Sequence, residues 1–205
     1  MPPDSLIPPH GGYKKLRTYK LGNLIYDATA AFCEQYLDRK DRTYDQMVQA
    51  ARSGVANIIE GSEASATSKK TELKLTNVAK ASQEELLTDY QAFLRQRGLP
   101  EWQLDSPPIQ TLRQVKPETL DQLRQLMAAL VSDPALGAAR DRTDKAALKA
   151  EVAGNVMIGL IKQETYLLER QITRLATDFE QKGGFTERLH RIRTEVRKKV
   201  KEDRD

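Results

Sequence analysis

The stretch Lys145–Gln181, KAALKAEVAGNVMIGLIKQETYLLERQITRLATDFEQ, decides the fold. Its apolar residues recur at steps of three and four, which is typical of a long helix that buries one face. These residues are Val152, Val156, Leu160, Leu167, Leu168, Ile172, Leu175 and Phe179. Within the stretch, Val156–Ile161 is apolar on all sides, which an exposed helix face does not sustain. We therefore predict a second buried surface there, covered by another element or another subunit, and we expect oligomerisation.

Three earlier segments show the same helical periodicity. The first begins near residues 15–19, and the second is capped by Asp41 or Thr43 and ends at Gly61. The third stops at the sequence Gly98–Leu99–Pro100. Their apolar stripes span Leu21–Tyr36, Met47–Ile58 and Leu75–Leu94. Each segment therefore has a face that must pack on another helix.

A proline-containing stretch separates the third segment from the longest helix. Trp102–Lys116 contains Pro107 and Pro108 and is predicted to be a loop. Pro117, at a first-turn position, then opens a shorter helix. We interpret residues 102–143 as an insertion.

These patterns predict an all-α fold: an antiparallel up-down four-helix bundle with an inserted short helix and a C-terminal basic helical tail. Glycines and prolines at the N-terminus and the pair Gly183–Gly184 mark the boundaries. The predicted domains are a flexible leader (1–12), the bundle (13–182, with the insertion 102–143) and a basic amphipathic suffix (183–205).

The composition limits the partners, metal sites and membrane attachment that we expect for this chain. The 205 residues carry 33 basic and 29 acidic side chains. The resulting net charge of +4 favours polyanions as binding partners. Cys33 is the single cysteine, so neither an intramolecular disulfide nor a thiolate metal cluster can form. No apolar run approaches the roughly 20 residues that a membrane span needs. We therefore predict a cytoplasmic protein without membrane attachment.

Three blocks of sequence resemble a known family. QMVQAARSGVANIIEG at Gln46–Gly61 is similar to the signature of the four-helix-bundle proteins known as 23S rRNA intervening-sequence proteins. SKKTE at Ser68–Glu72 and AKASQEEL at Ala79–Leu86 stand where that family has its polar loop and its Ala-x-Gly-Ser step followed by Glu-Leu. Asn155 and Tyr166–Leu168 fit its last helix.

The resemblance covers Tyr13 to about Leu99 and the last long helix, but not Trp102–Thr143. Gly54–Val55 replaces the usual Ile-Pro, and Ala81 replaces the usual Gly. The tail motif at Gly183–Arg188 resembles a suffix on one branch of the family.

The resemblance implies a compact bundle, commonly a homopentamer, with no recognised enzyme activity. Some members of the family are encoded within insertions in ribosomal RNA genes. Others, the accessory variability proteins of diversity-generating retroelements, assist a reverse transcriptase and bind nucleic acid through a basic surface.

Polar residues accompany the apolar stripes of the second and third segments. They are Ser53, Asn57, Glu60, Ser82 and Glu85. Paired carboxylates are compatible with acid-base or metal chemistry, but we interpret the set as a structural hydrogen-bond network between helices. His10 and His190 lie in the leader and the tail, so no catalytic triad or Glu-x-x-His pair can be assembled. The sequence predicts no enzyme activity, no cofactor and no metal.

Basic side chains gather in three places. The predicted nucleic-acid-binding residues are Lys14, Lys15 and Arg17, then Lys69 and Lys70, then Arg188, Arg191, Arg193, Arg197, Lys198 and Lys199. The lysines at 69 and 70 either bind phosphate at a helix N-terminus or belong to a solvated loop. In the tail, apolar residues at helical spacing predict an amphipathic basic helix, which also suits a membrane surface, a partner groove or plain solvation.

From these patterns we expect a non-enzymatic, oligomeric accessory protein that contacts RNA or DNA phosphate. The partners expected are further copies of the chain, a nucleic acid, and a reverse transcriptase or other protein. The alternative is an oligomeric protein-protein scaffold that binds no nucleic acid.

Overall fold

The computed structural model describes residue 7, residues 10–138 and residues 144–202. This part of the chain contains helices and no strand, which confirms the all-α prediction. The elements are η1 (Gly12–Lys15), α1 (Arg17–Tyr36), α2 (Arg42–Ala64), α3 (Lys69–Gln96), α4 (Pro107–Val115), α5 (Leu120–Ser132), α6 (Pro134–Ala138), α7 (Lys145–Lys182) and α8 (Phe185–Glu202). The predicted leader lies mostly outside the described residues.

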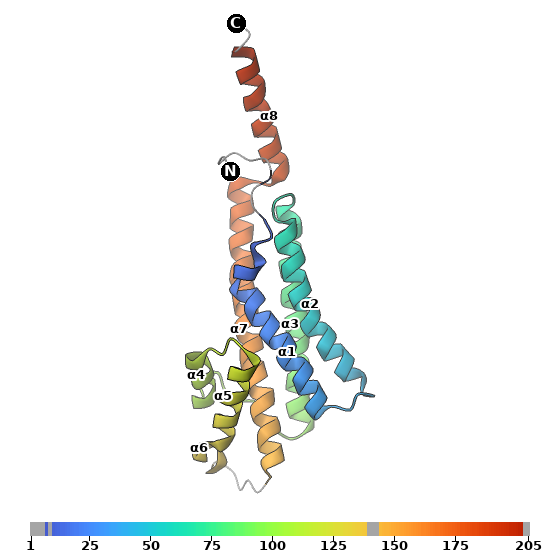
Figure 1. Cartoon of the computed structure of the whole chain (residues 1–205), viewed down its shortest axis with the longest axis vertical. Coiled ribbons are helices and arrows are strands. Elements are labelled where there is room, and N and C mark those ends of the chain that lie inside the picture. The colour runs from blue at the N-terminus through green and yellow to red at the C-terminus, as the bar shows by residue number, and fades with distance from the viewer. Residues whose placement is uncertain (1–6, 8–9, 139–143, 203–205) are drawn as a thin grey trace.

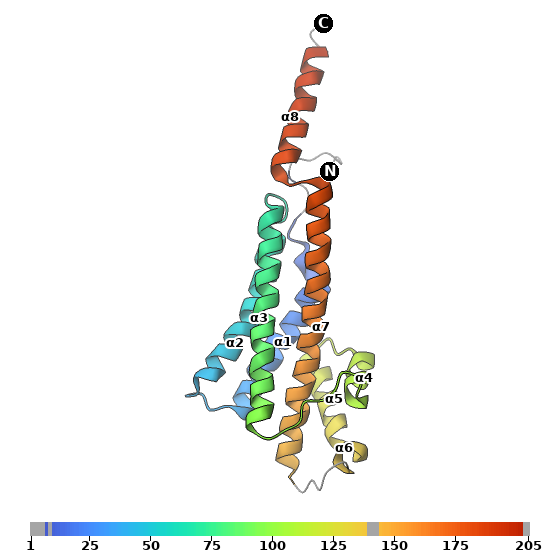
Figure 2. The same cartoon turned by 180° about the vertical axis from the view of Figure 1, so that it is seen from behind.

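Four long helices lie side by side (Figures 1 and 2). α1 packs on α2 and α7, and α3 packs on the same two helices from the other side. The turn between α2 and α3 lies at the same end as the last turns of α7. The core between them is apolar and includes Ile25, Met47, Leu86, Tyr90, Met157 and Ile161, all fully buried. This core holds α1, α2, α3 and α7 in register.

Local signals set the ends of the helices. Asp41 caps α2 by accepting a hydrogen bond from the Thr43 amide, and Ser68 caps α3 by accepting one from Thr71. α2 continues past Gly61, so its predicted end there is wrong. Gly61 is buried inside the helix, where an added Cβ would lie 3.4 Å from the Leu75 Cβ. This glycine therefore permits a close approach of α3 rather than ending α2.

The segment predicted as a loop contains a helix. Pro107 and Pro108 occupy the first turn of α4, where a missing N–H and a fixed φ are tolerated. The following helix begins at Leu120 rather than at Pro117, because Thr119 and Gln122 form a reciprocal capping box. The first correction replaces a predicted loop with a helix, and the second moves the start of the next helix three residues along the chain.

The all-round apolar part of α7 is covered within the chain. Residues 156–158, 160 and 161 are buried, which confirms the predicted second surface. An added Cβ at Gly159 would lie 2.7 Å from Leu112 of α4, and Met157 lines a small cavity with Leu123 of α5. Figures 1 and 2 show α4, α5 and α6 along one side of α7. This surface therefore gives no reason to require a second subunit.

A polar clamp fixes the start of the α4–α6 segment on α7. The Asn155 side chain accepts a hydrogen bond from the Trp102 amide at 2.7 Å and donates one to the Pro100 carbonyl at 2.9 Å. The Trp102 indole N–H donates to the Glu151 carboxylate at 2.8 Å. Because the Asn155 and Glu151 side chains are buried, these hydrogen bonds satisfy them and hold the chain at the point where it leaves α3.

Replacing Asn155 with alanine is expected to destabilise the protein by about 1–3 kcal/mol, because the Trp102 amide and the Pro100 carbonyl lose their partner. Trp102 is the single tryptophan, so its emission should shift to the red as the clamp opens. Urea unfolding followed by fluorescence measures both effects. Gln103→Ala, on an exposed neighbour, is the matched control. An unchanged midpoint in Asn155→Ala would show that the clamp adds nothing to stability.

Within the described residues, none of the helices combines the length and the hydropathy that crossing a lipid bilayer requires.

Candidate nucleic-acid interface and basic pocket

The predicted basic clusters lie just before and at the start of α1, at the start of α3, and on α8. The Gly11 amide donates to the Ser62 carbonyl at 3.2 Å, which places the chain before α1 against the end of α2. Lys69 forms a 2.7 Å ion pair with Glu72, whereas Lys70 is exposed. Lys69 is therefore already neutralised within the chain, and Lys70 is the more available cation of the pair.

The basic tail forms α8, which continues beyond the end of α7 (Figures 1 and 2). Gly183, with a φ of 68°, ends α7, and Glu187 accepts a hydrogen bond from the Gly184 amide at the start of α8. Arg191, Arg193, Arg197 and Lys198 are exposed, Arg188 is half-buried, and the Lys199 side chain lies outside the described set.

The apolar stripe of α8 is not packed on the long helices. Val196 and Val200 are 54% and 46% exposed, and α8 shares no extensive interface with another described element. Leu189 and Ile192, nearer the start of the helix, are half-buried. α8 therefore presents both its cations and much of its apolar stripe to solvent.

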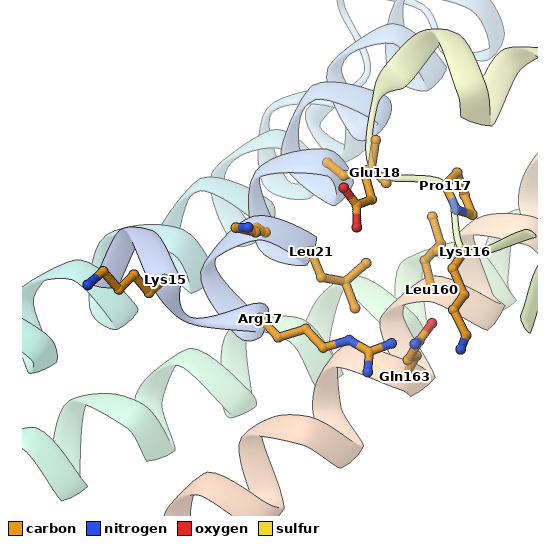
Figure 3. A pocket seen from close by; sticks show the side chains of 10 residues that line it. Lys15, Arg17, Leu21, Lys116, Pro117, Glu118, Leu160 and Gln163 are labelled. Atoms are coloured by element: carbon orange, nitrogen blue, oxygen red, sulfur yellow. The ribbon is translucent and has the colours of Figure 1, made fainter. Parts of the chain in front are cut away.

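A basic pocket of about 300 Å³ lies where the start of α1 meets the chain between α4 and α5 (Figure 3). Its polar lining comprises the cations Lys15, Arg17, Lys20 and Lys116, together with Glu118 and Gln163. In the described part of the chain none of the four cations forms an ion pair. The pocket therefore carries an excess of positive charge, with four cations against one carboxylate.

Backbone geometry positions the cations of this pocket. Leu16 precedes α1 in an extended conformation without a side-chain cap, and the first turn of α1 contains no acidic residue. The positive end of the helix dipole is thus left uncompensated beside Arg17. Lys116 has a φ of 49°, in the left-handed region, and its amide donates to the Leu112 carbonyl at 3.0 Å. Figure 3 shows the side chains of Arg17 and Lys116 extending toward Gln163.

The structure brings together part of the predicted polar network. The hydroxyls of Ser53 and Ser82 lie 3.0 Å apart and join α2 to α3. The Asn57 amide donates to the Ser53 carbonyl at 2.8 Å. Glu60 and Glu85 are exposed and are not brought into this network. The serine pair is consistent with a structural role, because it satisfies polar groups where two helices approach closely.

Sequence reasoning missed a deeper polar layer. Gln83 of α3 and Glu164 of α7 are fully buried, and their side-chain polar atoms have no hydrogen-bond partner among the described residues. A Cβ added at Gly22 would lie 2.7 Å from a side-chain oxygen of Glu164. A Cβ added at Gly54 would lie 2.3 Å from the side-chain nitrogen of Gln83. The two glycines therefore make room for the two long polar side chains.

Burial raises the pKa of Glu164 to about 8, and no charged neighbour opposes this effect. The carboxyl group is therefore largely protonated at neutral pH. A signal was present in the sequence, since Glu164 stands midway between Leu160 and Leu168 on the buried stripe of α7.

The remaining potentially reactive groups are the thiol of Cys33 and the side chains that could bind a metal ion. Burial raises the pKa of the Cys33 thiol to about 12, so the thiol is protonated and unreactive at neutral pH. Among the described residues, no group of three histidine, cysteine or acidic side chains is arranged to hold a metal ion.

Comparisons of this chain with protein-family models, with curated proteins and with solved structures gave no match.

Proposed function

We propose that this protein is a non-enzymatic accessory factor that binds RNA or DNA through phosphate contacts. The observation that carries the proposal is the placement of α8, which extends beyond the long helices with four described cations exposed. A projecting basic helix can lie along a polyanion without any rearrangement of the core. The basic pocket at the start of α1 adds positive charge away from this helix.

The binding is expected to be nearly independent of sequence. Lysine and arginine side chains supply charge, and the chain has no zinc-finger pattern, RRM signature or recognition-helix motif for reading base edges. Counterion release then sets the salt dependence of binding. Each phosphate contact contributes about 0.9 to the slope of log affinity against log salt concentration on duplex DNA, and about 0.7 on single strands.

The test is fluorescence anisotropy of the full chain with labelled single-stranded RNA, single-stranded DNA and duplex DNA of equal length. We expect all three to bind, with an affinity that falls linearly with salt on logarithmic axes. Absence of binding at low salt would overturn the proposal and favour the scaffold. A strong preference for one sequence would overturn the phosphate mechanism.

The antiparallel up-down four-helix bundle and the family of 23S rRNA intervening-sequence proteins belong to the same proposal. The side-by-side packing of α1, α2, α3 and α7 supports the bundle. The three sequence blocks, which lie on α2, on the start of α3 and further along it, support the family. A reverse transcriptase as partner and a cytoplasmic location rest on the resemblance and on composition.

A homo-oligomer, a pentamer by the resemblance, remains part of the proposal. The apolar surface of α7 no longer argues for it, because α4 and α5 cover that surface in the same chain. Light scattering at micromolar concentration tests it: a closed ring gives a multiple of the chain mass. The mass of a single chain would contradict it.

The scaffold alternative has an observation of its own. Val196 and Val200 on α8 are exposed, and an apolar stripe of this kind can pack into a groove of a protein partner. A partner held through this stripe would stay bound at salt concentrations that dissociate nucleic acid. Binding that survives high salt therefore distinguishes the scaffold from the nucleic-acid factor.

A further inference from the structure

We infer that the basic pocket binds the terminal phosphate of a nucleotide. The inference concerns a site apart from α8, and it depends on the proposed function only if the nucleotide is the end of a nucleic-acid strand. The pocket is formed by three segments: the start of α1, the chain at 116–118 and the middle of α7.

Charge identifies the ligand as an anion. Four cations and one carboxylate, Glu118, line the pocket, and none of the four cations is neutralised by an ion pair in the described residues. Like charges gathered in a concave site repel one another, and a bound anion relieves that repulsion. A phosphate monoester carries a charge of about −1.5 to −2 near neutral pH, which matches this excess better than the single charge of a backbone diester.

The donors suit a phosphate group in particular. Arg17 offers a planar guanidinium that can hold two phosphate oxygens at once, whereas Lys116 provides a point charge. Both side chains extend toward Gln163, whose amide supplies an uncharged donor from α7. The three groups come from three segments that only the fold brings together.

The remaining lining explains why the phosphate would carry a nucleoside. Apolar side chains form the rest of the wall: Leu21, Leu24, Pro117 and Leu160. An apolar wall beside a cluster of cations matches a ligand with a charged end and a less polar end, such as a phosphorylated nucleoside. A volume of about 300 Å³ is at the small end of ligand sites, so it suits one nucleotide rather than several.

The backbone at Lys116 allows a clean test. A left-handed residue is strained when it carries a side chain, and glycine adopts this conformation without steric strain, which offsets its larger loss of conformational entropy on folding. Lys116→Gly therefore removes the cation while holding or raising the melting temperature. We expect its affinity for AMP to fall about tenfold, and that of Arg17→Gln to fall 10- to 100-fold. Glu118→Gln should bind AMP a few-fold more tightly, because it removes the single carboxylate of the lining.

Isothermal titration of the full chain with AMP and with adenosine measures these effects, and Lys74→Gln, an exposed lysine of α3, is the control. The site is supported if AMP binds and adenosine does not, and if Lys116→Gly and Arg17→Gln weaken AMP binding while Glu118→Gln strengthens it. Absence of AMP binding, or equal affinities of the parent and Lys116→Gly, would overturn it.

A second measurement separates the sources of the nucleotide. Oligonucleotides with a 5′-phosphate or a 5′-hydroxyl are compared on the parent and on Lys116→Gly. A preference for the 5′-phosphate that disappears in the variant assigns the pocket to a strand end. AMP binding without such a preference assigns it to a free nucleotide. Because Lys116→Gly leaves α8 intact, binding of the 5′-hydroxyl strand reports on the proposed function independently.

Discussion

Replacing Glu164 with glutamine is expected to make the protein more stable by about 3 kcal/mol at pH 7. The carboxyl group is fully buried, and its oxygens have no hydrogen-bond partner in the described structure. Its pKa rises from an ordinary value of 4.5 to about 8, with burial as the cause. Unfolding at neutral pH therefore releases a proton that the folded state retains.

The sign of the pH dependence follows from this shift. Below pH 4.5 the group is protonated in both states, and its full contribution to stability is present. As the pH rises to about 8, the unfolded chain ionises while the folded chain does not, so stability is lost by about 1.4 kcal/mol per pH unit. Above that value the loss levels off, because both states are ionised. Glutamine stays neutral throughout, so the advantage of the variant should grow across this window.

Urea unfolding of the parent and Glu164→Gln at several pH values between 5 and 8 measures the difference. Glu180→Gln, an exposed acid on the same helix, is the control and should show a constant difference from the parent. Parallel stability curves for Glu164→Gln and the parent would show that Glu164 ionises normally in the folded state.

Neutralising the tail is expected to reduce the affinity for single-stranded nucleic acid by on the order of 10³-fold at 0.1 M salt. The variant changes five residues to glutamine: Arg191, Arg193, Arg197, Lys198 and Lys199. If each cation contacts one phosphate, the salt slope decreases by about 3.5, at about 0.7 per contact. The apolar stripe is untouched and α8 has little contact with the rest, so the core should keep its melting temperature.

A control variant with the same net charge as the tail variant distinguishes the effect of where the cations lie from the effect of total charge. It carries five glutamines at exposed positions elsewhere, namely Lys40, Arg52, Lys74, Arg95 and Arg113. This control should bind with nearly the slope of the parent protein. If the tail variant keeps the affinity and slope of the parent, the assignment to α8 is wrong. The Lys69–Lys70 turn at the start of α3 would then be the better candidate.

Much of the helical structure was predictable because its signals are local. The stripes that define α1, α2, α3 and α7 repeat within a few residues, which is the range of helical hydrogen bonds. α4 is not predicted from the sequence because two consecutive prolines favour a loop, although Pro107 and Pro108 are compatible with the first turn of a helix. The end of α2 was misplaced because Gly61 serves packing rather than termination.

The candidate sites were predictable only in part. Lys15 and Arg17 stand close together in the sequence and were predicted to bind phosphate, but Lys116 joins them only through the fold. Glu164 was passed over although it lies on the apolar stripe, because a charged residue at one buried position does not disturb the periodicity of a long helix.

The sequence by itself determined that the chain is helical, where most of its helices lie, and that its tail is a basic amphipathic helix. Backbone hydrogen bonds, caps and side-chain periodicity act over four residues or fewer, so they can be read along the chain. Only the tertiary structure decided that α4 and α5 cover Val156–Ile161, that Glu164 is buried without a hydrogen-bond partner among the described residues, and that Lys116 lines the same pocket as Arg17. These outcomes depend on which surfaces exclude water from one another, and that is settled by packing between helices distant in sequence.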